Sequence, residues 1–203
     1  MTIIAWDGRM LAADSSTAIG NTVEARPDSK ITVLEDGRAF ACTGASSDVQ
    51  RFRSWMAAGG YPPVLVEPQS FAALLCVPDA DPTARVKCFL IEGDSLAYPM
   101  EVSGLQAIGA GRDWVLGAMT AMRADAVADY MDAQKDPAAW HPRPHMAFGD
   151  EGCAALAVML ACGRNPVYPS VLHACGPIDY AQWRPSEGRW KVGALSTMGA
   201  APE

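Results

Sequence analysis

The sequence predicts an α+β fold in which sheets and helices form separate layers. Strand patterns come first, followed by helices, strands, helices and a last group of strands, whereas a parallel sheet would alternate the two regularly. Hydrophobic residues make up 50% of the chain and charged residues 19%, which is typical of a globular domain. A length of 203 residues fits one domain, over residues 1–203, with a sizeable core.

The opening stretch MTIIAWDGRMLAAD predicts a β-hairpin. Residues 3–6 and 9–13 form its arms, and Asp7-Gly8 is a favoured pair for a two-residue type I′ turn. In that register Thr2 lies opposite Ala13. The start of the chain is therefore expected to be held in a sheet.

A polar connection rich in small residues spans residues 14–30, and strands follow at 30–34 and 38–44. Residues 45–60 predict a helix with apolar positions at helical spacing. The features that support this helix are apolar Val49, Phe52 and Met56, a cap at Ser46 or Ser47, Asp48 in the positive first turn and the Gly59-Gly60 stop.

The remaining elements continue the same order. Glu67-Pro68 predicts the start of a second helix, which contains Phe71, Leu74 and Leu75. Beyond it the patterns predict a hairpin at 84–102, a buried strand at 105–111, a long helix at 112–135, a Pro-rich insertion at 136–149, a buried helix at 152–163 and strands at 167–176 and 189–196. In the insertion, Trp140 and Phe148 provide apolar area for docking, and a contact between subunits is our hypothesis for its role.

Composition and motifs exclude several classes of function. A net charge of −7 without any basic run disfavours a nucleic-acid partner. No apolar stretch reaches the length of about 18 residues that a membrane helix needs, and no leader pattern opens the chain, so a cytoplasmic location is expected. The stretch GAGRDW resembles the start of a dinucleotide-binding motif, but Trp114 stands where that motif has its third glycine. A dinucleotide-binding fold is therefore disfavoured.

No metal or other cofactor is expected. The prolines in His141-Pro-Arg-Pro-His145 prevent the helix that would align the two histidines on one ion. The six cysteines show no CxxC pair and are expected to be core thiols. They are Cys42, Cys76, Cys88, Cys153, Cys162 and Cys175.

Thr2 combines a hydroxyl with a free α-amine if Met1 is removed. An α-amine has a pKa of about 7.7–8.0, so the neutral form can take the hydroxyl proton, directly or through a water molecule. A cation would favour the neutral amine, a carboxylate would hold that cation, and a backbone N–H at a glycine turn would stabilise an oxyanion. Lys30, Asp14 and Gly44 fit these roles, although each alone has an ordinary structural interpretation.

In this order the residues resemble proteasome β-subunits and their bacterial relatives, which are N-terminal nucleophile hydrolases. The motifs are TIIAWDGRMLAAD, IGNTV, SKITVL with Lys30 sixteen residues after Asp14, CTGASSD ending at Asp48, and LQAIGAG. The resemblance is strong over residues 2–60 and returns at 86–120. The chain is most similar to the stand-alone bacterial proteasome homologues.

The resemblance implies a four-layer αββα sandwich and a threonine peptidase that acts on peptides or unfolded proteins. Thr2 would be nucleophile and base, Asp14 and Lys30 would tune it, and Gly44 would donate to the oxyanion. Substrate would bind along the strand at Thr17 and Ala18, and Asp28, Cys42 and Ser46 would line the first specificity pocket. The resemblance also implies that this chain forms a double ring of about 12 to 14 identical subunits, with an unidentified ATPase as a further expected partner.

Two departures from the family pattern leave alternatives open. The Gly-Ser-Gly turn of the family reads Gly109-Ala110-Gly111, which removes a serine that contacts the terminal amine. The acidic and hydroxyl residues that follow the last buried helix in the family have no clear match here, and only Asn165 and Ser170 could replace them. An assembled ring with little or no activity is therefore one alternative, and a small-molecule amidohydrolase is another.

Overall fold

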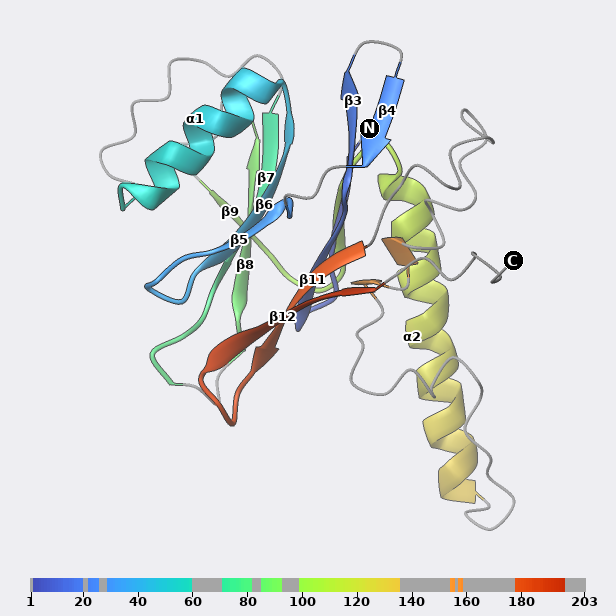
Figure 1. The fold of residues 1–203 in the computed structure, drawn as a ribbon. Helices are drawn as coiled ribbons and strands as arrows, with labels where there is room; N and C mark the ends of the chain where they lie inside the picture. The colour runs from blue at the N-terminus through green and yellow to red at the C-terminus, as the bar shows by residue number, and fades with distance from the viewer. Residues whose placement is uncertain are drawn as a thin grey trace, which may run out of the picture.

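A computed structural model of the chain contains two five-stranded sheets in which every strand pairs antiparallel to its neighbours (Figure 1). The residues that the structure describes are 2–19, 22–25, 29–59, 71–81, 85–92, 99–135, 154–155, 157–158 and 178–195. Antiparallel sheets with separate helices confirm the predicted α+β class and exclude a dinucleotide-binding parallel sheet in this part of the chain.

The first sheet has the strand order β10-β1-β2-β11-β12 and the second has the order β5-β6-β7-β8-β9. The strands of the first sheet are β1 (Ile3–Trp6), β2 (Met10–Asp14), β10 (Gln106–Gly109), β11 (Ile178–Arg184) and β12 (Arg189–Leu195). Those of the second are β5 (Ile31–Val33), β6 (Ala39–Gly44), β7 (Phe71–Val77), β8 (Lys87–Glu92) and β9 (Met100–Val102). A separate hairpin joins β3 (Ser16–Ile19) to β4 (Thr22–Ala25), and the two long helices are α1 (Ser46–Ala57) and α2 (Arg112–Lys135).

Three hydrophobic clusters arrange these elements in layers. Because strand side chains alternate between faces, Ile4 and Trp6 of β1 point toward the second sheet, whereas Ile3 and Ala5 point toward α2. The opposite face of the second sheet packs against α1 through Phe52. Figure 1 shows α1 beside the second sheet and α2 beside the first. The order helix, sheet, sheet, helix is compatible with the predicted αββα sandwich.

The predicted turn of the first hairpin is wrong by one residue. Asp7 pairs with Met10, so the central residues are Gly8 and Arg9, and only Gly8 has a positive φ, of 101°. The turn is therefore not type I′, which needs positive φ at both positions. The Asp7 carboxylate moves the turn because it accepts the N–H groups of Arg9 (2.9 Å) and Met10 (2.8 Å).

This shift changes the register of the whole hairpin. Ile4 pairs with Ala13, where the sequence had predicted Thr2 opposite Ala13. The corrected register brings the backbone of Ile3 opposite Asp14. Ile3, the first residue of β1, therefore lies nearer to the Asp14 carboxylate than it would in the predicted register.

Three other expectations are corrected. Residues 71–77, predicted as part of a second helix, form the central strand β7, in which Phe71, Leu74 and Cys76 are buried between strand neighbours. Composition predicted only a polar connection after Asp14, but the β3–β4 hairpin forms there, and β3 contains Thr17 and Ala18, where the resemblance implied a strand. The first residue before α1 is Ala45, which caps the helix without a side-chain hydrogen bond, so neither Ser46 nor Ser47 is the cap.

Most other elements match their predicted positions. The hairpin β8–β9, the strand β10, the helix α2 and the strand β12 form where the patterns placed them, and buried helical residues 154–155 and 157–158 lie in the predicted apolar helix. β11, between the two last predicted strands, is an additional strand. The insertion 136–149 and the strand predicted at 167–176 lie outside the described residues.

Candidate active site

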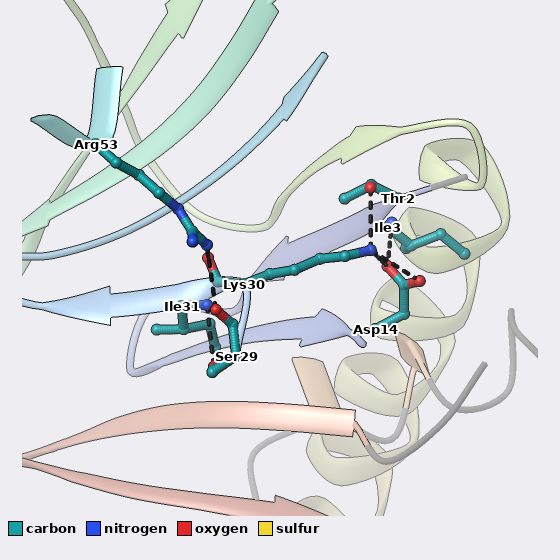
Figure 2. Close-up of polar contacts among 7 residues, drawn as sticks. All are labelled: Thr2, Ile3, Asp14, Ser29, Lys30, Ile31 and Arg53. Carbon is teal, nitrogen blue, oxygen red and sulfur yellow. Dashed lines mark hydrogen bonds and ion pairs between the residues drawn. The ribbon is translucent and has the colours of Figure 1, made fainter. Parts of the chain in front are cut away.

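Three side chains from separate parts of the chain meet at the end of the first sheet. The Lys30 Nζ donates to the Thr2 Oγ1 at 3.0 Å and to both carboxylate oxygens of Asp14 at 3.1 Å (Figure 2). The Asp14 residue is 1% exposed and Lys30 is 9% exposed, whereas Thr2 is half-buried. The ammonium thus lies between a buried carboxylate and a hydroxyl that solvent can reach.

Asp14 is fixed by the hairpin that precedes it. It is the last residue of β2, and its Oδ1 accepts the backbone N–H of Ile3 at 2.6 Å. The same oxygen accepts the Lys30 ammonium, so one carboxylate holds both the start of β1 and the lysine. A charge-assisted bond of this length is among the stronger hydrogen bonds in proteins.

Lys30 comes from the other sheet. It directly precedes β5, and its side chain extends across to Thr2 and Asp14 of the first sheet (Figure 2). The relative placement of the two sheets therefore determines the distance between the Lys30 Nζ and the Thr2 Oγ1.

The backbone of Thr2 is held by the turn between β10 and α2. The Ala110 N–H donates to the Thr2 carbonyl oxygen at 3.1 Å. Gly109 has a φ of 95°, and a Cβ at this position would lie 1.9 Å from the Thr2 carbonyl oxygen. A Cβ on Gly111 would lie 2.6 Å from the side chain of Ile3. The two glycines of this turn are needed because the chain start packs directly on them.

This arrangement can activate a hydroxyl. An ammonium within hydrogen-bond distance of an oxygen stabilises the developing negative charge when that oxygen loses its proton. A buried carboxylate keeps the ammonium charged and oriented. The Thr2 nitrogen becomes an amine, able to accept that proton, only after the peptide bond to Met1 is cleaved.

The other predicted site residues lie in β3, β6 and α1 or outside the described residues. Gly44 ends β6 with a φ of 139° and is exposed, and Ser46 is exposed at the first position of α1. Cys42 is 4% exposed and packs beneath α1. Thr17 and Ala18 lie in β3, opposite Glu24 and Val23 of β4. Asp28 lies outside the described residues.

The sequence did not point to Asp179, a half-buried residue of β11. Burial raises the pKa of the Asp179 carboxyl above its usual range, although hydrogen bonds from the Ser29 side chain and the Lys30 N–H and the charge of Lys30 oppose this, and the charge of Asp14 adds to it. The sequence signal that could have indicated a strand here is the β-forming set Ile178, Tyr180 and Trp183 between Pro177 and Pro185. The contact with Ser29 and Lys30 has no local signal, because 149 residues separate Lys30 from Asp179.

Other site types find no support in the described residues. They contain no cluster of histidine, cysteine or carboxylate side chains that could hold a metal ion. Cys42, Cys76 and Cys88 are free and buried, and burial raises the pKa of Cys42 to about 11. Among the helices described, none is both long and apolar enough to cross a membrane.

Comparison with known proteins relates the fold to solved structures. The chain is similar to the structure titled "Thiobacillus denitrificans BPH in complex with Epoxomicin", with 20% identity, a TM-score of 0.54 and coverage of 97% of this chain and 100% of that one. It is likewise similar to "Thiobacillus denitrificans BPH", with 20% identity, a TM-score of 0.53 and coverage of 91% and 98%. At this identity the likeness shows a shared fold. No family model matches the sequence, and no curated protein matches it.

Proposed function

We propose that this chain is a threonine-type N-terminal nucleophile peptidase with the proteasome β-subunit fold. The observation that carries the proposal is the 3.0 Å hydrogen bond from the Lys30 Nζ to the Thr2 Oγ1, with Asp14 bound to the same ammonium. The fold shared with a protein whose structure was solved in complex with epoxomicin, a proteasome inhibitor, supports it. The substrate class follows from the resemblance to proteasome subunits.

The reaction begins once Met1 is removed. The Thr2 α-amine accepts the proton of the Thr2 hydroxyl as the Oγ1 forms a bond to the peptide carbonyl carbon, and the Lys30 ammonium stabilises the oxygen during this transfer. The N–H of Gly44 is the proposed donor to the oxyanion. The amine proton then passes to the leaving nitrogen as the C–N bond breaks, and water hydrolyses the remaining ester.

We also propose the substrate contacts and the assembly that the resemblance implies. An extended peptide would pair with β3 at Thr17 and Ala18 through backbone hydrogen bonds, and Asp28, Cys42 and Ser46 would line the pocket for its side chain. The subunits would form a double ring with the sites facing a central chamber, fed by an ATPase or by diffusion.

The decisive test combines intact mass with one substitution. We expect the purified protein to lack Met1, to gain the mass of epoxomicin on Thr2 and to hydrolyse fluorogenic peptides. Thr2→Ala should abolish labelling and hydrolysis, whereas Thr120→Ala, which removes an exposed hydroxyl on α2, should leave both unchanged. Turnover by protein that retains Met1 would contradict the mechanism, because its Thr2 nitrogen is not an amine.

One observation favours an inactive ring as the second candidate. Position 110, whose N–H binds the Thr2 carbonyl oxygen, has no hydroxyl to contact the terminal amine. Failure of mature protein, without Met1, to bind epoxomicin would support this candidate. Hydrolysis of simple acyl amides but of no peptide would indicate the amidohydrolase alternative.

A further inference from the structure

The segment Ser29–Ile31 carries the lysine of the candidate site and is held by its own side chains. The Ser29 Oγ accepts the N–H of Ile31 at 3.1 Å, directly before β5. The Lys30 side chain leaves this segment toward Thr2, in the other sheet. A movement of the segment would therefore be transmitted to the Lys30 Nζ.

Arg53 of α1 binds this segment from the outer helix layer. Its Nη2 donates to the carbonyl oxygen of Ser29 at 3.1 Å and to that of Lys30 at 3.2 Å (Figure 2). Both bonds are part-buried and span more than twenty residues of sequence. Part-buried bonds from a charged donor are stronger and more directional than neutral ones.

Arg53 also lies near the residue predicted to line the specificity pocket. Burial raises the pKa of the Cys42 thiol, and the charge and hydrogen bond of Arg53 partly oppose this effect. Cys42 in turn packs with Phe52 in the cluster beneath α1. One guanidinium thus contacts the backbone of Lys30 and the core that supports α1.

We propose that Arg53 is a positioning residue, which holds the backbone of Lys30 so that its ammonium reaches Thr2. The proposal rests on the proposed function, since it assigns a purpose to the distance between the Lys30 Nζ and the Thr2 Oγ1. The site draws Thr2 and Asp14 from the first sheet and Lys30 from the second, so no strand pairing fixes Lys30 relative to the other two. Asp179 of β11 accepts the Lys30 N–H from the side of the first sheet. Arg53 supplies a second constraint, from α1, on the carbonyl groups of the same segment.

The chemistry of the contact predicts which substitution preserves it. A single nitrogen, Nη2, makes both bonds, so a lysine ammonium, which has three donors, can replace the guanidinium where it reaches the same carbonyl groups. Methionine has an apolar stem of similar length but no donor. Arg51 is exposed on the same helix and serves as the matched control.

The experiment measures kcat and KM for a fluorogenic peptide in Arg53→Met, Arg53→Lys and Arg51→Met. We expect kcat to fall roughly tenfold or more in Arg53→Met at an unchanged KM, because a displacement of about 1 Å in a catalytic group can cost as much as 10²-fold. Arg53→Lys should recover most of kcat, and Arg51→Met should equal the wild type. An unchanged kcat in Arg53→Met, or a change in KM alone, would overturn the proposal.

Hydrogen–deuterium exchange over residues 29–33 provides a second measurement that needs no activity. We expect faster exchange in Arg53→Met and wild-type exchange in Arg51→Met. Faster exchange with an unchanged kcat would reduce Arg53 to a structural role and overturn the proposal. If the wild type hydrolyses no peptide, the proposed function fails. In that case, unchanged deuterium exchange over residues 29–33 in Arg53→Met would also refute the contact between Arg53 and this segment. Should Arg53→Met fail to fold, Arg53→Leu, which also lacks a donor, takes its place in both measurements.

Discussion

Replacing Lys30 by methionine would test whether the ion pair at the site is a buried one. The substitution removes the ammonium and keeps most of the apolar stem. The side chain of Asp14, 2% exposed, would lose a partner that contacts both its oxygens, while its bond to the Ile3 N–H remains. A buried carboxylate that loses its cation retains the cost of leaving water without the attraction that offset it.

The expected loss of stability is large for one side chain. Removing one partner of a buried ion pair costs about 3–5 kcal/mol in the free energy of unfolding. For a chain of 203 residues, 1 kcal/mol shifts the melting temperature by about 2–4 °C. Lys30→Met should therefore melt about 6–20 °C below the wild type. Peptide hydrolysis should also be lost, because Thr2 loses the donor to its hydroxyl.

Circular dichroism and peptide turnover measure the two effects, and the chain offers a matched control. On the surface, the Lys87 Nζ lies 3.8 Å from the Asp79 Oδ2, and the two side chains are 51% and 38% exposed. Lys87→Met should therefore lower the free energy of unfolding by less than about 1 kcal/mol. Adding Asp14→Asn to Lys30→Met removes the stranded charge and keeps an acceptor for the Ile3 N–H. This double variant should recover most of the lost stability and remain inactive. A Lys30→Met variant as stable as the Lys87 control, or turnover in the double variant, would refute the reasoning.

Three further predictions concern residues around Thr2. Ala110→Ser should raise peptide turnover between about pH 6 and pH 9, by less than the 10²–10⁴-fold of a full acid–base group, if a missing hydroxyl limits proton transfer; an unchanged rate would show that another group already serves. Gly109→Ala should abolish turnover and lower the melting temperature, whereas Gly104→Ala, with a similar φ of 94° and no atom within 4 Å, should cost only backbone strain; equal effects in the two variants would exclude the clash with Thr2. Because the pKa of Asp179 is raised in the folded state, the contribution of Asp179 to stability should fall as pH rises through the acidic range; the melting temperature of the wild type relative to Asp179→Asn should therefore decrease from about pH 4 to pH 8, and a constant difference would contradict it.

Much of the fold could be predicted because the signals are local. Helical spacing placed α1 and α2, and short β-forming or apolar runs bounded by turns placed β5, β6, β8, β9, β10 and β12. The three residues of the candidate site, Thr2, Asp14 and Lys30, could also be named: a cation and a carboxylate suit the chemistry of a terminal threonine, and the resemblance to proteasome β-subunits selected these positions. Their meeting within hydrogen-bond distance is what the structure adds.

The errors arose where distant contacts decide the structure. The Asp7 carboxylate accepts the N–H of Ala154 at 3.0 Å as well as the two turn N–H groups, and no local pattern predicts a partner 147 residues away. The run Phe71–Val77 is apolar on both faces, because the first sheet covers one face of β7 and α1 covers the other. A short apolar run of this kind does not distinguish a central strand from a buried helix. The contact of Asp179 with the Lys30 segment depends on β11 pairing with β2, which only the assembled sheet creates.

The contacts around Thr2 indicate what removal of Met1 has to accomplish. In the chain that includes Met1, the Thr2 Oγ1 already accepts the Lys30 ammonium, and the Thr2 carbonyl oxygen already accepts the Ala110 N–H. Asp14 binds the Ile3 N–H, one residue beyond the bond that would be cleaved. None of these contacts uses the Thr2 nitrogen. Cleavage would therefore create the base by exposing an amine beside an arranged hydroxyl, so activation would be a chemical step that requires no rearrangement of the sheet.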